Sequence, residues 1–227
     1  MNFNGQTNES EPRELGGRDL PSIGILGFGR VGTVLARLAH QAGYRVTAAA
    51  SGDPDAIAMI RDVLAPGVAL GWPQHVAETA DILILALPLH AQRELSADSL
   101  SGKIVVDATN HWRDVDGPRE DWVPPGATTS EFLQRLLPGA RLIKAFNHVG
   151  YRDLAPGIAI ALVGDDREAA ETVASLIGAM GFQAVDLGPL SQGRLLEPGA
   201  AAFGAALPEG ELRRLIETSS ASAWVAR

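Results

Sequence analysis

Residues Ile23–Gly32 read IGILGFGRVG, a short apolar run that leads into a glycine-rich turn. Gly27, Gly29 and Gly32 form the pattern G-x-G-x-x-G, and apolar residues then recur at helical spacing as far as position 42. A strand, this turn and a helix in succession predict the first unit of a dinucleotide-binding domain. The glycines let a pyrophosphate approach the backbone, and the helix N-terminus offers it free N–H groups. The alternative interpretation is a glycine turn that binds no ligand.

Strand and helix patterns alternate along the rest of the chain. The run ILILAL at 82–87 is apolar at every position, which is typical of a strand buried on both faces of a parallel sheet. Further strands are expected at 45–50, 104–108, 142–146, 158–163 and 184–187, and helices near 55–64, 130–137, 167–180 and 209–217. This alternation predicts an α/β fold with a Rossmann-type, doubly wound, mostly parallel sheet and a C-terminal αβ extension.

Composition narrows the class of protein. The chain has 227 residues, a formal net charge of −8 and no cysteine, so we expect neither disulfides nor a thiolate metal site. It lacks the clustered Lys and Arg that bind nucleic acid, and its five histidines lack the i, i+4 spacing of a metal site. The longest apolar run is far shorter than the roughly 20 residues that span a bilayer. We therefore expect no metal, no nucleic-acid or membrane partner, and a cytoplasmic location.

The domain organisation is expected to be simple. Residues 1–20 are polar and contain glycines, which predicts a disordered arm that is not a secretory signal. Residues 21–227 are expected to form one NAD(P)-binding Rossmann domain, because no linker interrupts the strand and helix patterns. The Gly/Pro-rich stretch 117–129 is expected to be a long loop over the sheet.

The end of the second strand should select between NAD and NADP. Asp53 lies about 20 residues beyond the glycines, where a carboxylate binds the ribose 2′-OH of NAD. It also precedes a proline, where aspartate commonly caps a helix. Ser51 is placed to hold a 2′-phosphate, and Arg30 could reach the same phosphate. We predict NADP as the cofactor, with NAD as the alternative.

Polar and rigid residues follow three strands of the predicted sheet, and parallel sheets bind ligands at that edge. Asn110 and Asn147 could hydrogen-bond the nicotinamide amide or a carbonyl of the partner, or act as turn formers. His111 and His148 are candidate proton donors or packed loop residues. Trp112 could stack on a flat ring or cover the core. Together with Leu87 and Pro88, these residues are expected to line one crevice.

Several segments, in this order and spacing, resemble a known family. They are Ile23–Gly32, then DILILALP at 81–88, GKIVVDATN at 102–110, KAFN at 144–147, and a C-terminal run from Gly164 to Pro198. The chain resembles the NADPH-dependent F420 reductases, also called F420-dependent NADP oxidoreductases, which move hydride between NADP(H) and a deazaflavin. Gly52 departs from the Gly-Ser-Arg of that family, whereas Ser51 matches it. His111 and Trp112 stand where the family more often has a proline.

The resemblance implies an oxidoreductase that uses NADP with coenzyme F420 as its candidate co-substrate, works as a homodimer, and has an acceptor-site extension at about 165–227. The expected cofactor-binding residues are Gly27, Phe28, Gly29, Arg30, Val31, Gly32, Ser51, Leu87, Pro88, Asn110 and Ala145. The expected catalytic residues are His148, Asn147 and His111, and the expected acceptor-binding residues are Trp112, Asn147, Gly188, Pro189 and Leu190. Two alternatives stay open: a reductase of the same fold that acts on a flavin or a small carbonyl or imine compound, and a non-catalytic dinucleotide sensor.

Overall fold

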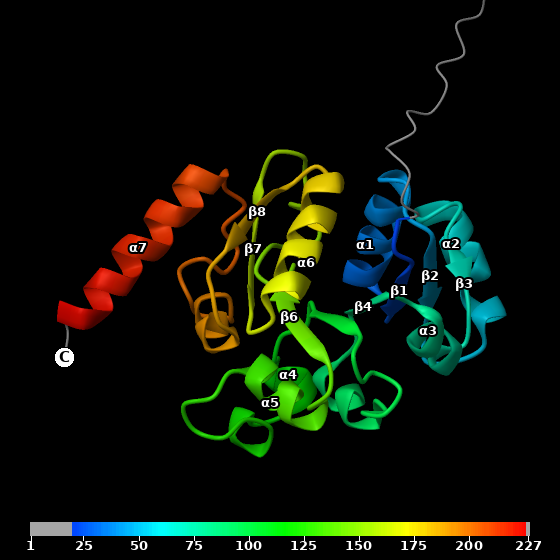
Figure 1. Ribbon diagram of the computed structural model, residues 1–227, viewed down its shortest axis with the longest axis horizontal. Coiled ribbons are helices and arrows are strands. Elements are labelled where there is room, and N and C mark those ends of the chain that lie inside the picture. The colour runs from blue at the N-terminus through cyan, green and yellow to red at the C-terminus, as the bar shows by residue number, and fades with distance from the viewer. Residues whose placement is uncertain (1–19, 226–227) are drawn as a thin grey trace, which may run out of the picture.

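The computed structural model describes residues 20–225, which form an eight-stranded sheet with helices on both faces (Figure 1). The strands are β1 (Ile23–Leu26), β2 (Val46–Ala49), β3 (Ala69–Leu70), β4 (Ile82–Leu85), β5 (Ile104–Asp107), β6 (Arg141–Ala145), β7 (Ala159–Gly164) and β8 (Gln183–Asp186). The α-helices are α1 (Arg30–Gln41), α2 (Ala58–Leu64), α3 (Pro73–Thr79), α4 (Arg113–Asp116), α5 (Thr129–Leu136), α6 (Arg167–Ala179) and α7 (Glu209–Val225). Short 3₁₀ helices occur at η1 (Pro54–Ile57), η2 (Leu89–Glu94), η3 (Arg119–Asp121) and η4 (Leu190–Leu195).

The strand order is β3-β2-β1-β4-β5-β6-β7-β8, and neighbouring strands run parallel except β6 and β7. The chain adds strands on one side of β1 up to β3 and on the other side from β4 onwards, so the parallel strands β1 and β4 meet at the switch point. Such sheets bind ligands at this point. The predicted α/β fold class is therefore confirmed. The sequence patterns missed β3 and α3, which are only two and seven residues long.

Two hydrophobic clusters cover the two faces of the sheet. Side chains of β4 alternate between them, with Ile84 packed on the side of α1 and α6, and Leu83 and Leu85 on the side of α3 and α5. All four residues of β4 are buried, as the unbroken apolar run predicted. The clusters hold the carboxyl ends of the strands in fixed register, and those ends carry the site.

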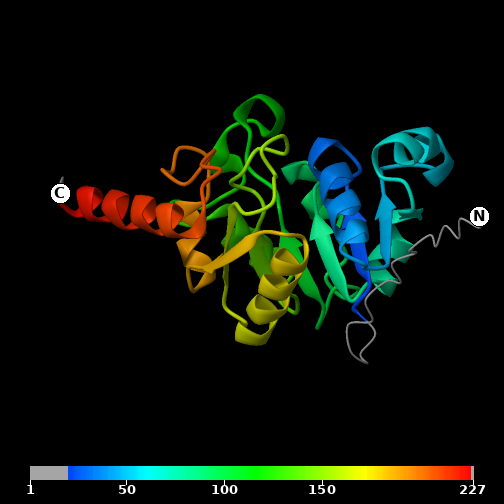
Figure 2. The same ribbon diagram turned by 90° about the horizontal axis from the view of Figure 1, so that it is seen from above.

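Helix α7 starts against the sheet and then leaves it. Leu212 is buried in the same cluster as α5, whereas the helix as a whole projects away from the sheet in both views (Figures 1 and 2). The expected N-terminal arm lies outside the described residues except for Leu20. Within residues 20–225, no helix combines the length and hydropathy that crossing a bilayer would require.

Candidate functional site

The glycine turn joins β1 to α1 by very close packing. Gly27 has a φ of +102°, a conformation that favours glycine. A Cβ on Gly32 would lie 1.8 Å from the carbonyl oxygen of Gly27, so only glycine lets the helix approach the turn this closely. A Cβ on Gly29 would meet nothing within 4 Å, and Gly29 lines a large cavity. Gly32 therefore serves packing, and Gly29 keeps space open for a ligand.

One cavity of about 1240 Å³ extends from this turn across the carboxyl ends of the strands. The lining residues that follow strands β1 to β4 include Gly27, Gly29, Ser51, Trp72 and Leu87, and we call this part of the lining the nucleotide half. Those that follow β5 and β6 or lie in the C-terminal segment include Asn110, Trp112, Phe146, Asn147 and Phe203, and we call this part the acceptor half. Sites for a single small ligand usually measure roughly 300–1000 Å³. The cavity is therefore larger than the usual site of a single small ligand.

The expected cofactor-binding residues divide into those that line the cavity and those that do not. Gly27, Phe28, Gly29, Val31, Ser51, Leu87, Pro88 and Asn110 line it. Arg30 is exposed at the start of α1 and does not line it, and Gly32 is used in packing. Ala145 is fully buried within β6 and does not reach the cavity, so its assignment to the cofactor is corrected.

The loop after β2 resolves the two interpretations of Asp53. Its side chain accepts a hydrogen bond of 2.9 Å from the backbone N–H of Asp55 and caps η1. The capping interpretation is confirmed, because this carboxylate satisfies a free N–H at the start of a helix. Ser51 is exposed and lines the cavity, and a Cβ on Gly52 would meet nothing within 4 Å.

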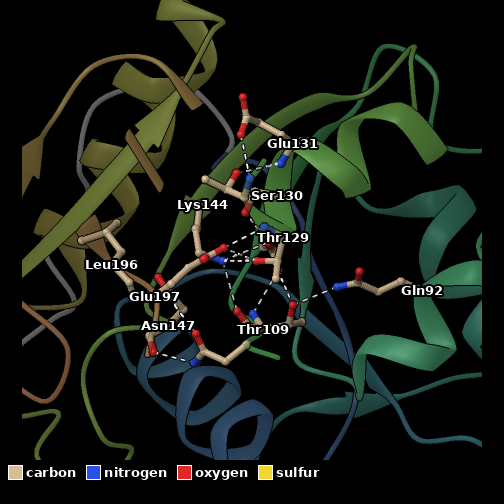
Figure 3. Close-up of polar contacts among 12 residues, drawn as sticks. Gln92, Thr109, Thr129, Ser130, Glu131, Lys144, Asn147, Leu196 and Glu197 are labelled. Carbon is tan, nitrogen blue, oxygen red and sulfur yellow. Dashed lines mark hydrogen bonds and ion pairs between the residues drawn. The ribbon is translucent and has the colours of Figure 1, made fainter. Parts of the chain in front are cut away.

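Asn110 and Asn147 bind each other across the acceptor half. The Asn110 side-chain amide donates to the Asn147 carbonyl (2.8 Å), and the Asn147 amide donates to Asn110 Oδ1 (3.0 Å) and to the Leu196 carbonyl (2.7 Å; Figure 3). Asn147 Oδ1 is buried and has no hydrogen-bond partner within residues 20–225. These bonds fix the two loops, and they leave one carbonyl oxygen able to accept an N–H from a ligand.

Phe146, at the end of β6, has a strained backbone conformation. Phe146 has a φ of +64°, and it is the only non-glycine residue with a positive φ in the range that the structure describes. Such a backbone is costly for a bulky side chain and is concentrated at functional sites. Here it ends β6 and is followed directly by Asn147, and both residues line the cavity.

His148 lines the same cavity as Trp112, but it is not available as a proton donor. Its Nε2 accepts from the N–H of Ala161 (2.9 Å), which leaves Nδ1 as the protonated nitrogen beside the Ala202 carbonyl (3.3 Å). Burial lowers its pKa to about 4, and the hydrogen bond to Ala202 opposes that shift. The expected catalytic role is corrected, because both ring nitrogens are engaged by the backbone and the ring stays neutral.

His148 should make stability depend on pH. Its folded-state pKa lies below the ordinary value near 6.5, so below pH 6.5 the unfolded chain takes up a proton that the folded chain does not. Stability is therefore lost as the pH falls from 6.5 towards 4. Urea unfolding measures the free energy of unfolding at pH 7 and at pH 4.5. The fall between these two pH values should be about 2 kcal/mol larger in the wild type than in His148→Gln. The same substitution at the exposed His75 is the control, and parallel profiles for His148→Gln and the wild type would contradict the prediction.

His111 points away from the large cavity. Its Nε2 lies 2.9 Å from the Gly117 carbonyl, and it lines a small separate cavity of about 180 Å³ with Arg119 and Glu197. The expected catalytic role of His111 is corrected, because the next residue, Trp112, takes the position at the large cavity. The Trp112 side chain is about half exposed and meets Phe203 edge to face, with ring centroids 5.9 Å apart.

The segment 188–190 does not close the far side of the cavity. Leu190 is buried against the sheet, and its N–H donates to Asp165 (2.9 Å), while the N–H of Gly188 donates to Asp186 (2.8 Å). None of Gly188, Pro189 and Leu190 lines the cavity, so their expected position is corrected. Phe203 and Gly204 line it instead.

A buried charged network behind the site was missed by the sequence patterns. Lys144 and Asp107 form an ion pair of 3.2 Å, and both side chains are fully buried. Asp107 also accepts from Ser130 Oγ (2.5 Å) and from the N–H and hydroxyl of Thr109 (3.0 and 2.6 Å). Burial alone would raise the pKa of Asp107, but Lys144 and these hydrogen bonds outweigh it and lower the pKa.

The network joins the turn after β5 to the C-terminal segment (Figure 3). Lys144 Nζ donates to the Thr109 carbonyl (3.2 Å) and to the Thr129 hydroxyl (3.3 Å). Glu197 accepts from the N–H and the hydroxyl of Thr129 (2.7 and 2.9 Å). Thr109 precedes Asn110, and Leu196 binds Asn147, so the network supports both asparagines from behind. A charged residue inside each of two neighbouring apolar strands is the signal that could have revealed it.

A doubly wound sheet, a glycine turn and a cavity along the carboxyl edge define a Rossmann-type dinucleotide-binding domain. Comparison with known proteins makes this more specific. Residues 22–111 match the family model described as "NADP oxidoreductase coenzyme F420-dependent". The resemblance inferred from the sequence is therefore confirmed.

Individual relatives and a solved structure are also similar to this chain. The rat (Rattus norvegicus) Metalloreductase STEAP3 is 28% identical over 188 residues, which are 79% of this chain and 36% of the relative. The F420-dependent NADP reductase of Methanocaldococcus jannaschii is 29% identical over 133 residues, 53% of this chain and 59% of the relative. A hypothetical protein from Sinorhizobium meliloti has a similar structure, with a TM-score of 0.71 and 28% identity over 83% of this chain and 96% of that one. The chain thus spans about a third of the length of the first of these curated relatives and somewhat under two thirds of the second.

Proposed function

We propose that the chain is an NADP(H)-dependent oxidoreductase that transfers a hydride between the nicotinamide and a planar acceptor bound in the acceptor half. The observation that carries this proposal is the single cavity, which joins the glycine turn to the Trp112–Phe203 wall. The name of one relative, an F420-dependent NADP reductase, suggests coenzyme F420 as one candidate for that acceptor. The family resemblance in the sequence favours a homodimer as the assembly. The composition and the family resemblance support a cytoplasmic location.

The residues present fit a dinucleotide. The open space at Gly29 suits a pyrophosphate, and the start of α1 offers it backbone N–H groups. Asn147 Oδ1 could accept the carboxamide N–H of a nicotinamide. When bound, the nicotinamide would supply or take up the hydride.

The rest of the site would position the reactants and exclude water. Leu87, Ala108 and Phe146 give the cavity apolar walls, and Trp112 and Phe203 give it an aromatic side. His148 is neutral and engaged, and His111 lies elsewhere, so neither histidine acts on the reactants. Positioning of two bound rings is the contribution that such a site can make.

Turnover with a panel of acceptors tests the proposal. Purified protein is mixed with NADPH or NADH and with F420, FMN, FAD or a cyclic imine, and oxidation of the nicotinamide is followed by its absorbance. Oxidation that depends on an acceptor supports the proposal. Tight nucleotide binding without turnover on any acceptor would instead indicate a dinucleotide sensor.

The choice between the two nicotinamide cofactors gives a sharper prediction. We expect NADPH to bind more tightly than NADH by only about 1–2 kcal/mol, because Ser51 offers a hydroxyl and Gly52 offers no guanidinium. Gly52→Arg should increase the preference for NADPH by about tenfold, since the side chain has open space and Arg binds phosphate through two N–H groups. Fluorescence titration of both nucleotides measures this, with Gly52→Gln as the uncharged control. A preference for NADH in the wild type would contradict it.

A further inference from the structure

The large cavity has an unusual charge for a site that would hold anionic cofactors. The residues that line it include four carboxylates, Glu78, Glu94, Asp116 and Asp153, and among the described residues no Lys or Arg lines it. Asp116 binds the backbone N–H of Trp112, and Asp153 lies in the loop that follows Asn147, so both belong to the acceptor half as defined above. An anionic acceptor placed there would meet like charge without a compensating cation.

Asp116 is the most informative of these carboxylates. Its side chain is only 1% exposed. One oxygen, Oδ2, accepts from the backbone N–H of Trp112 (2.8 Å), whereas Oδ1 is buried without a hydrogen-bond partner in the described part of the chain. A buried carboxylate oxygen that accepts no hydrogen bond raises the free energy of the folded state. The site therefore lacks one hydrogen-bond donor for Asp116 Oδ1.

The imidazole of His90, which lies close to Asp116, does not supply that donor. His90 Nδ1 lies 3.8 Å from Asp116 Oδ1, beyond hydrogen-bond distance, and its side chain is 55% exposed. His90 does not line the cavity, whereas Asp116 does. The missing donor is therefore expected from a molecule that enters the cavity.

Two neighbours define what such a molecule would look like. The ring of Trp112, about half exposed, belongs to the residue whose N–H binds Asp116, and the face of a tryptophan ring attracts cations. Asn147 Oδ1 is a second buried acceptor without a partner in residues 20–225 that lines the same cavity. The site thus offers a flat aromatic surface, a negative charge and acceptor oxygens.

We infer that the acceptor half binds a planar nitrogen cation that carries N–H donors, such as a protonated imine or amidine, with Asp116 as the residue that recognises its charge. This inference rests on the proposed function, since it names the chemical class of the acceptor. Among the described residues, this half of the cavity has no Lys or Arg that would bind an anionic acceptor.

Three isosteric probes test the inference without requiring turnover. The full-length chain is saturated with NADP⁺ and titrated calorimetrically with benzamidinium, benzamide and benzoate, which have the same shape and the charges +1, 0 and −1. Benzamidinium should bind about tenfold more tightly than benzamide. Benzoate should bind more weakly than both.

A matched pair of variants then assigns the effect to Asp116. Asp116→Asn keeps an acceptor for the Trp112 N–H and removes the charge, so it should weaken benzamidinium binding by about tenfold and leave benzamide within about twofold. Asp114→Asn removes a charge from the exposed neighbour on the same helix, and it should leave all three affinities unchanged.

Benzoate binding as tightly as benzamidinium, or equal effects of the two variants, would overturn the inference. If Asp116→Asn does not fold, as judged by its thermal transition, the order of the three probes in the wild type decides the question. The NADP⁺ titration separates the two proposals. Failure to bind NADP⁺ counts against the proposed function, whereas NADP⁺ binding with a preference for benzoate counts against the cationic acceptor alone.

Discussion

Replacing Lys144 by Met is expected to lower the free energy of unfolding by about 3–5 kcal/mol, because it leaves the fully buried Asp107 carboxylate without its cation. The hydrogen bonds from Ser130 and Thr109 do not replace the lost charge. Urea unfolding at pH 7 measures the change. Lys103→Met is the control. Lys103, the other lysine of the chain, is only partly buried and donates to two backbone carbonyls, so its loss should cost much less.

The pH dependence of this loss identifies its cause. In the wild type, the lowered pKa of Asp107 gives stability that is present above pH 4 and is lost only as the pH falls through that lowered pKa. In Lys144→Met, the lone buried carboxyl should have a raised pKa, so this variant loses stability as the pH rises. The difference from the wild type should therefore shrink by about 1.4 kcal/mol for each pH unit below the raised pKa. An equal difference at pH 7 and pH 5 would point to lost packing alone.

Gly29→Val is expected to keep the fold and to weaken NADPH binding by on the order of a hundredfold. The added side chain meets nothing within 4 Å in the protein, and Gly29 has an ordinary extended backbone with a φ of −84°. The side chain would instead occupy the space through which a pyrophosphate reaches the N–H groups of the turn. Thermal unfolding and a fluorescence titration with NADPH measure the two properties separately.

Gly32→Ala provides the opposite control. The Cβ added at position 32 would lie 1.8 Å from the Gly27 carbonyl oxygen, so α1 could not pack on the turn as it does in the wild type. We therefore expect the main effect of this substitution to be a loss of stability. A folded Gly29→Val variant with unchanged affinity for NADPH would show that no pyrophosphate binds at this turn. If neither variant folds, a titration of the wild type with NADPH decides whether the protein binds the nucleotide.

The sequence by itself determined the features that depend on neighbours close in the chain. The glycine turn, the helix that follows it and the fully buried β4 strand are local patterns, and the structure contains all three. The edge of the sheet that carries the cavity also followed from the sequence, because alternating strands and helices restrict the topology to a few arrangements. Asn110, Trp112 and Asn147 therefore line one cavity as expected.

Only the tertiary structure decided how individual polar side chains are used. The sequence places Asp107 and Lys144 in separate apolar strands, and only the register of β5 against β6 makes them direct neighbours. His148 was predicted to donate a proton, but Ala161 and Ala202 lie beside it in space and engage both of its nitrogens. Leu190 was expected at the cavity, but η4 buries it against the sheet. Hydrophobic periodicity indicates which face of an element is buried. The partner of a polar group, by contrast, is often a residue far away in the chain, and only folding brings the two together.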